Sequence, residues 1–418
     1  MTASASAPAT ARPPTAPASG AAGGALPPMV RGRISVIDSA RGAAILLVCI
    51  SHFALAYLAR LGGGAAAAWW IFAGHIASPM FIIINGAMIG YLHGGNPQRF
   101  AVTRRRLAVR ALLLVTVAHA LIVIAHVPRV GGWREALRWL FVTDTIAVAL
   151  LIAPLFVRMR PMKRTAACLA AYAGACMLVY GWHPAALPLR YIKDTLFGSD
   201  GVSVWAYNVP LVPWLALDVA SLTVGEWLLA GPSASPTLVL EGLLGKSGAF
   251  FVGSAVAVKI TYWTIHAAGL IPLGRPLIIA SALASPWTRI PPSPEYMLLF
   301  GGMAMLAIVG VLAGGRMNVC APVWRWLASL GRASAMAYVL QYYILYLVVE
   351  RFAPISWVLA PFIFAGVMVA MTAGVHLWTH AGSERRRLAT PARPAVLLQP
   401  VGAHGRGLRA SPPGSGDL

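Results

Sequence analysis

The chain has 418 residues, of which 58% are hydrophobic and only 11% are charged. With a mean hydropathy of +0.72, this composition excludes an ordinary water-soluble domain and indicates a polytopic membrane protein. The formal net charge is +21, but the basic residues are spread thinly between apolar runs. They therefore indicate membrane topology rather than a nucleic-acid-binding patch.

Apolar stretches of about twenty residues, the length that crosses a bilayer as a helix, recur along the chain. They predict an all-α fold, a transmembrane helix bundle of about ten spans. The expected spans are residues 42–61, 68–92, 107–127, 139–157, 165–181, 207–230, 247–271, 296–314, 334–352 and 354–381.

Three regions follow from composition. Residues 1–30 are rich in Ala, Pro, Ser and Thr and lack the pattern of a signal peptide, so we expect a disordered cytoplasmic tail. Residues 31–382 form the expected transmembrane domain. Residues 383–418 are expected to be a disordered basic tail, held at anionic lipid by Arg385 to Arg387.

The distribution of basic residues predicts the orientation in the membrane. If the amino terminus is cytoplasmic, the inner side holds most of the arginines and lysines, including Arg104 to Arg106, and the outer side holds far fewer. This predicts that both termini are cytoplasmic. The loop 128–138, with three arginines on the outer side, is the exception. The Ala- and Arg-rich composition suggests a bacterial source and hence a bacterial inner membrane.

The two longest outer connections, residues 182–206 and 272–295, carry aromatic and polar side chains. They either cap a site that opens outward or lie in the membrane interface. Both interpretations remain open at this point.

The first span begins with charge and ends with a histidine. Asp38 and Arg41 share a helical face at the membrane edge, and His52 lies eleven residues beyond Arg41, about 16 Å deeper along a helix. In one interpretation, Arg41 anchors the helix at the headgroups and His52 is a satisfied core residue. In the other, His52 is functional, because an ionisable group at bilayer depth is costly to bury.

Other polar residues fall at depth in the expected spans: His75, His119, His126, Asp144, Asp218 and Lys259. We expect Asp218 or Glu226 to pair with Lys259 as a buried ion pair. A neutral histidine can take a proton from a hydroxyl or an amine and return it. Asp144 either orients such a histidine or bonds a neighbouring helix.

The expected inner loop 96–110 has a dense basic cluster that includes Arg106 and Arg110. A phosphate-rich cytosolic donor such as coenzyme A is one explanation, and contact with anionic lipid is the other. The four cysteines have no metal-type spacing, so no metal site is expected.

Several motifs together resemble the multi-span membrane acyltransferases. That group comprises the acyltransferase-3 family, the osmoregulated-glucan succinyltransferases and the heparan-alpha-glucosaminide N-acetyltransferase relatives. The motifs are Ile37-Asp38-Ser-Ala-Arg41-Gly42 followed by His52, Ile76-Ala-Ser-Pro79 up to Asn85-Gly86, Val209-Pro210 up to Pro213-Trp214, Pro291-Pro292-Ser293 and Leu330-Gly331-Arg332-Ala-Ser334. The chain departs from many acyltransferase-3 members at Gln341, where they have a histidine.

The resemblance implies an acyl-CoA-dependent acyltransferase that acts on a hydroxyl or an amine of a saccharide-like or small-molecule acceptor. It implies His52 as base or acyl relay, and Asp38 and Arg41 as residues that organise the inner mouth near the donor. The pattern of polar residues at depth adds His119 and Asp144 as further candidate catalytic residues. Residues expected to bind substrate are Asp38, Arg41, His75, Arg106, Arg110 and Trp214. Membrane lipid is an expected partner, and the oligomeric state is left open. The alternative is a proton-coupled transporter or flippase that uses the buried ionisable groups.

Overall fold

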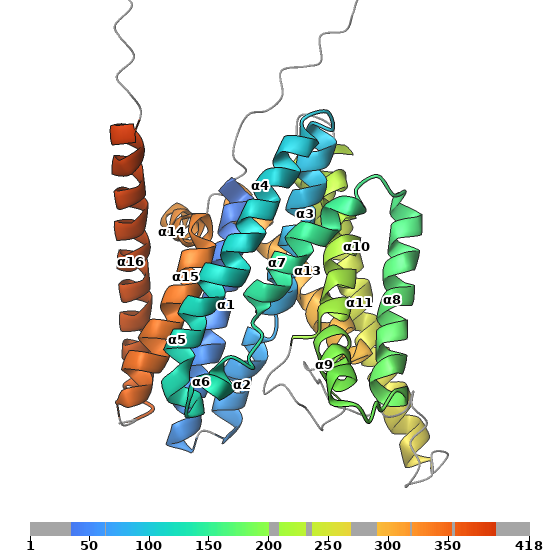
Figure 1. Cartoon of the computed structure of the whole chain (residues 1–418), viewed down its shortest axis with the longest axis horizontal. Coiled ribbons are helices and arrows are strands. Elements are labelled where there is room, and N and C mark those ends of the chain that lie inside the picture. The colour runs from blue at the N-terminus through green and yellow to red at the C-terminus, as the bar shows by residue number, and fades with distance from the viewer. Residues whose placement is uncertain are drawn as a thin grey trace, which may run out of the picture. The chain divides into compact units, whose positions relative to one another are not determined.

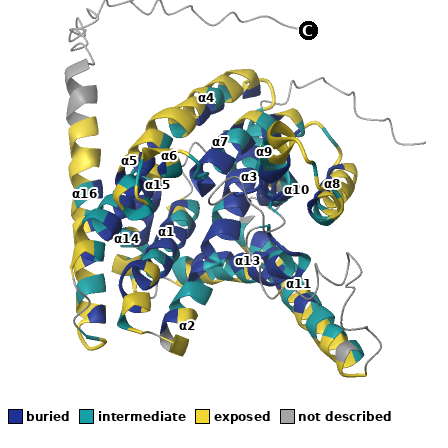
Figure 2. Cartoon of the chain, turned by 60° about the horizontal axis from the view of Figure 1, so that its bottom comes forward, coloured by how far each residue is buried: buried dark blue, intermediate teal, exposed yellow. Residues whose placement is uncertain are grey.

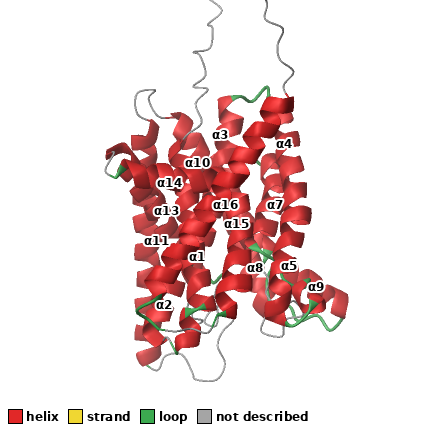
Figure 3. Ribbon diagram, turned by 90° about the vertical axis from the view of Figure 1, so that its left-hand side faces the viewer, coloured by secondary structure: helices red, strands yellow, loops and turns green. Residues whose placement is uncertain are grey.

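The computed structural model describes residues 35–62, 64–199, 209–230, 236–268, 291–317, 320–352 and 356–389. These residues form helices and connecting loops without a β-strand, so the all-α prediction is confirmed (Figure 3). The expected amino-terminal tail, most of the carboxy-terminal tail and residues 200–206 and 272–290 of the expected outer loops lie outside the described residues.

The longer helices are α1 (Ser35–Ala56), α2 (Gly64–Gly74), α3 (Ala77–Gly95), α4 (Phe100–Leu113), α5 (His119–Val130), α7 (Val142–Ile152), α8 (Pro161–Gly181), α9 (Leu187–Leu196), α10 (Leu211–Ala230), α11 (Pro236–Ala267), α13 (Pro294–Met317), α14 (Ala321–Arg332), α15 (Ser334–Tyr342) and α16 (Ala360–Ala389). The short ones are η1 (Leu58–Leu61), η2 (Leu114–Ala118), α6 (Trp133–Ala136), η3 (Ala153–Leu155), η4 (Tyr343–Val348) and η5 (Val349–Arg351).

Seven helical stretches among the described residues are long and apolar enough to cross a membrane, or eight if the pair α14 and α15, bent by 83°, counts as one broken span. They are Ser35–Leu61, Ala67–Gly95, Phe100–Val130, Leu211–Leu229, Thr237–Ile265, Pro294–Met317 and Ala360–Gly382. With the bent pair counted as one span, two expected spans account for the difference from ten. The apolar helix Val142–Leu155 is shorter than a span, and α8 carries Lys163 and Arg164 in its first turn.

The buried centre of the bundle contains α1, α3 and α10, whereas α8 and α16 expose much of their surface (Figure 2). Helices α3 and α10 cross with their backbones in close contact. A Cβ added at Gly86 would collide with the carbonyl oxygen of Asp218, and one added at Gly225 would collide with that of Ala87. Small residues are what allow such an approach in membrane bundles, where helix association depends on close packing.

A second close approach joins α1 to α14. A Cβ at Gly42 would collide with the carbonyl oxygen of Leu327, and one at Gly331 would collide with that of Asp38. Helix α14 therefore packs directly against the first two turns of α1. The last turn of α14 and residues 376–380 of α16 line one cavity, so the start of α1 and the end of α16 lie at the same end of the bundle (Figure 1).

Polar pairs, each with at least one buried partner, join neighbouring helices. The guanidinium of Arg164, whose side chain is fully buried, donates to both carboxylate oxygens of Glu226 at 2.9 and 2.8 Å. The Nζ of Lys259 donates to Glu295 at 3.1 Å, and Asp218 accepts a hydrogen bond of 2.7 Å from the amide of Asn85. The expected pairing of Lys259 with Asp218 or Glu226 is therefore wrong, because both carboxylates have partners on other helices.

Candidate active site

His119 and Asp144 form a direct pair between α5 and α7. The Nδ1 of His119 lies 3.0 and 3.1 Å from the two carboxylate oxygens of Asp144. The buried Asp144 also accepts the backbone N–H of Phe141 at 2.8 Å, which caps the first turn of α7. An ionised Asp144 accepts the Nδ1–H of His119 and so leaves the basic lone pair on Nε2.

His52 lies on α1 and packs against two tyrosines that are four residues apart in the broken span. Tyr342 is the last residue of α15, and Tyr346 lies in η4. The ring centroid of His52 is 5.3 Å from that of Tyr342 and 5.8 Å from that of Tyr346. Tyr342 in turn contacts the ring of Phe141 at 5.6 Å, and Phe141 contacts the ring of His119 at 5.7 Å. One aromatic shell therefore links His52 to the pair of His119 and Asp144.

His126 shares this shell, although the sequence alone did not single it out as a site residue. It is 2% exposed, and its ring contacts Trp139 at 4.1 Å, Tyr346 at 5.7 Å and Tyr342 at 6.2 Å. Neither ring nitrogen has a hydrogen-bond partner among the described residues. The available signal was the spacing of His119 and His126, seven residues or about two helical turns apart, which places both on one side of a helix.

Two of the helical stretches that carry this shell contain a π-helical segment at the site. Residues 114–118 are π-helical immediately before His119, and residues 343–348, which include Tyr346, are π-helical immediately after Tyr342. Such segments are rare and often accompany functional sites, because they redirect the side chains beside them.

A small cavity of about 10 Å³ lies beside His52. That volume is on the order of one water molecule. Its lining comes from α1, α2, α3, α7 and α15: Val48, Ser51, His52, Gly74, Ser78, Phe81, Val142 and Tyr338. Five elements therefore meet at His52, and an acyl donor requires this space to open.

His75 and Trp214 belong to a second aromatic group, in which both rings contact the ring of Tyr296. The His75 ring is 5.7 Å from that of Tyr296, and the Trp214 ring is 6.2 Å from it. The Tyr296 hydroxyl donates to the His75 carbonyl oxygen at 3.0 Å. Because Gly74, next to His75, also lines the cavity at His52, the two groups adjoin.

The remaining expected site residues lie elsewhere. Asp38 is buried and Arg41 is half-buried in the first turns of α1, beside α14. Arg106 and Arg110 are exposed on α4, before the π-helical segment that leads to His119. Among the described residues, no group of three or more His, Cys, Asp or Glu side chains could hold a metal ion.

These features define an integral membrane protein with several spans and a partly buried histidine–carboxylate pair of the kind that transfers protons. Residues 33–266 match the family model described as heparan-alpha-glucosaminide N-acetyltransferase, catalytic. The match covers more than half of the 418 residues, and the chain belongs to this family. A comparison with individual curated proteins gives no match.

Membership of the family confirms the predicted class of enzyme. The chain is an acyl-CoA-dependent acyltransferase with several membrane spans, from a family whose donor is acetyl-CoA. This confirms the resemblance drawn from the first helix and favours the enzyme over a transporter or flippase.

Proposed function

We propose that the protein transfers an acetyl group from cytosolic acetyl-CoA to the amine or a hydroxyl of a glucosamine-like acceptor. One observation supports this proposal. In a chain of this family, the rings of Tyr342 and Phe141 connect His52 to the pair of His119 and Asp144. The nucleophile on the acceptor must lose a proton as it attacks the thioester, and a neutral histidine supplies the base.

His52 is proposed as the base or as an acyl relay, and His119 as a second proton acceptor oriented by Asp144. In the first role, His52 removes the proton from the acceptor as the acceptor attacks the thioester carbon, the C–S bond breaks, and His52 returns the proton to the sulfur so that coenzyme A leaves as the thiol. In the second role, an imidazole nitrogen attacks the thioester carbon, the C–S bond breaks and coenzyme A leaves. The acceptor then takes the acetyl group as the bond between the acetyl group and the imidazole breaks. The buried aromatic surroundings exclude bulk water, which would otherwise hydrolyse the thioester.

The donor is proposed to enter at the end of the bundle that holds Asp38 and Arg41, which is then the cytoplasmic side. His52 lies deeper along the same helix, by about 16 Å from Arg41 at 1.5 Å per residue. His75 and Trp214, around Tyr296, are proposed to face the acceptor from the outer side. The exposed Arg106 and Arg110 fit a contact with donor phosphates or with anionic lipid on the inner surface.

The test is acetyl transfer by the detergent-purified protein from labelled acetyl-CoA to glucosamine. N-acetylglucosamine is the matched acceptor control, because it keeps the hydroxyls but has no free amine. We expect wild-type protein to transfer the label and His52→Ala to lose transfer by at least about 10²-fold, with an unchanged elution profile in size-exclusion chromatography. Full activity of His52→Ala would contradict the role proposed for His52.

The two acceptors separate the alternatives for the nucleophile. Transfer to glucosamine alone assigns the amine, whereas transfer to both assigns a hydroxyl. Transfer to neither acceptor, with acetyl-CoA still bound, contradicts the glucosamine-like acceptor and leaves the donor half of the proposal standing.

A further inference from the structure

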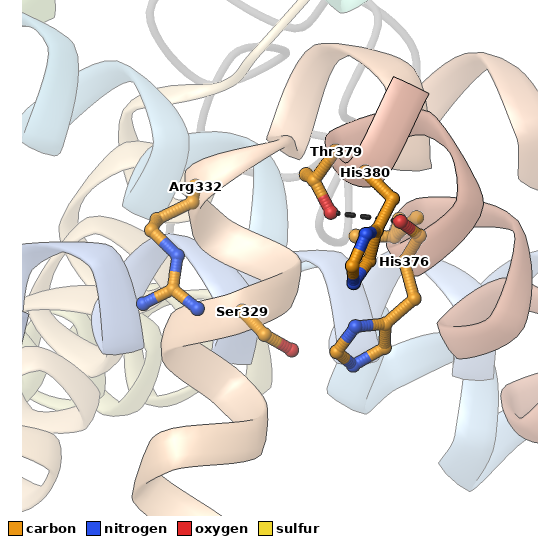
Figure 4. A pocket seen from close by; sticks show the side chains of 6 residues that line it. Ser329, Arg332, His376, Thr379 and His380 are labelled. Atoms are coloured by element: carbon orange, nitrogen blue, oxygen red, sulfur yellow. Dashed lines mark hydrogen bonds between the residues drawn. The ribbon is translucent and has the colours of Figure 1, made fainter. Parts of the chain in front are cut away.

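Polar side chains inside this bundle differ in whether their hydrogen bonds are made within the protein. The Thr379 hydroxyl, which lines the cavity between α14 and α16, donates to the carbonyl oxygen of His376 at 2.9 Å (Figure 4). His126, near the end of α5, is the opposite case. It is 2% exposed, and within the described ranges neither of its ring nitrogens has a hydrogen-bond partner.

A buried imidazole in this condition lowers the stability of the protein. Burying a polar group without a hydrogen bond costs free energy, whereas an apolar side chain of similar shape at the same position does not. A histidine at position 126 is therefore explained if another molecule supplies the missing partner during the reaction.

The rings around His126 are also those around His52. His126 contacts Tyr342 at 6.2 Å and Tyr346 at 5.7 Å, and His52 contacts the same two rings at 5.3 and 5.8 Å. Both imidazoles therefore border one pair of tyrosines. A molecule that reacts at His52 and extends past these rings reaches His126.

His126 lies toward the end of the bundle opposite the start of α1 (Figure 1). It is seven residues beyond His119, about 10 Å further along α5. In the next turn, the guanidinium of Arg129 lies 4.3 Å from the ring centroid of Tyr346 and pairs with Glu350 at 3.5 Å. The side chains of this pair are 25% and 26% exposed, so the surface begins one turn beyond His126.

The segment that carries the two tyrosines has an irregular backbone. Tyr342 ends α15, the π-helical segment η4 follows, and η5 is a 3₁₀ turn. This segment belongs to the second half of the span that is bent by 83°. Because both imidazoles border its tyrosines, movement of this one segment away from α5 would open His52 and His126 together.

We propose that His126 is an acceptor-binding residue, which exchanges a hydrogen bond with a hydroxyl group of the acceptor while the reacting amine or hydroxyl lies at His52. The acceptor then carries a second polar group beside its nucleophile, as a glucosamine-like molecule does. This inference rests on the proposed function, because it assigns a contact to the acceptor of that reaction.

Steady-state acetyl transfer from labelled acetyl-CoA to glucosamine by the purified protein tests this contact. His126→Phe removes both ring nitrogens and keeps an aromatic ring, and His126→Leu removes them with a smaller side chain in case phenylalanine does not fit. His126→Gln keeps one donor and one acceptor group. His93→Phe is the matched control, because His93 on α3 also packs on an aromatic ring, that of Phe100 at 5.0 Å, and lies outside the site.

We expect His126→Phe to raise the Michaelis constant for glucosamine by about tenfold, the effect of one lost hydrogen bond, and to leave that for acetyl-CoA unchanged. Its melting temperature should equal or exceed that of the wild type, because the substitution removes buried polar atoms without breaking a hydrogen bond. His126→Gln should raise the constant for glucosamine by less than about threefold. His93→Phe should change neither constant.

A wild-type Michaelis constant for glucosamine in both His126→Phe and His126→Leu would overturn the proposal, and so would an equal rise in His126→Gln and His126→Phe. A lower melting temperature in both apolar variants, with the constants for donor and acceptor raised alike, would assign His126 a structural role instead. Failure of the proposed function gives a different result, because the wild-type protein then transfers no acetyl group to glucosamine and both proposals are wrong.

Discussion

Asp144 has two partners, and they belong to different kinds of interaction. One is the N–H of Phe141, which the carboxylate accepts as the cap of α7, and the other is the Nδ1 of His119. The same buried carboxylate therefore stabilises the start of α7 and holds the ring of His119 in its orientation. The two contributions can be separated, because an amide oxygen retains the cap but carries no negative charge.

We expect Asp144→Asn to fold with nearly wild-type thermal stability and to lose acetyl transfer by about 10²-fold or more, because His119 loses the charge that orients and supports its protonated form. Asp144→Ala should show the same loss of activity and be less stable by about 1 kcal/mol, since the cap is also removed. Transfer rates and thermal unfolding of the two variants give the comparison. Wild-type activity of Asp144→Asn would show that His119 does not depend on this charge.

At the scale of helices, two crossings hold the site in place. Helix α3 presents Gly86 and Gly90 to α10, and α1 presents Gly42 to α14. Each crossing brings backbone against backbone, so the side chains on the other faces of these helices have fixed directions. His52 on α1 and the cavity lining on α3 depend on that rigidity.

Gly225→Ala should destabilise the protein by about 1–3 kcal/mol or more, because the added methyl group meets the carbonyl oxygen of Ala87 and overpacks the crossing. Gly174→Ala in α8 is the matched control, since a Cβ there meets no atom within 4 Å and alanine favours a helix. Thermal unfolding in one detergent measures both variants. Equal melting temperatures for the two would contradict the importance of the α3 and α10 crossing.

At the scale of the whole molecule, the described ends of the chain lie together. The start of α1 packs on α14, and residues 375–380 of α16 line a cavity with α14. The connection from α3 to α4 lies at the same end of the bundle (Figure 1). Helix α9 lies at the opposite end. The excess of arginine at the first end agrees with a cytoplasmic position for it.

Single cysteines introduced into a cysteine-free background test this orientation in intact cells. Gln98, in the connection between α3 and α4, and Ala186, before α9, are both exposed. We expect a membrane-impermeant maleimide to label Ala186→Cys and not Gln98→Cys, and to label both after the membrane is opened. The reverse pattern would place the donor entrance on the outer side and contradict the proposed function.

The sequence by itself determined the class of protein and much of the local structure. Apolar runs of sufficient length identified the spans, because a helix satisfies its own backbone hydrogen bonds in lipid. The motif from Asp38 to His52 pointed to the multi-span membrane acyltransferases, the group that includes the family of this chain. Asp144, one of the polar residues expected at depth, contacts His119 on a neighbouring helix. The spans and the motif of the first helix depend on residues close together in the chain, where spacing along one helix fixes their relation.

Only the tertiary structure decided which distant side chains meet. The rotation and crossing of each helix decide the direction of each polar residue, and glycines such as Gly42 and Gly225 allow two of these crossings. That is why Lys259 pairs with Glu295 rather than Asp218, and why His126 joins His52 at the same two tyrosines. The cavity at Arg332 likewise requires α14 and α16 to lie together, a contact between separate helices that no periodicity encodes.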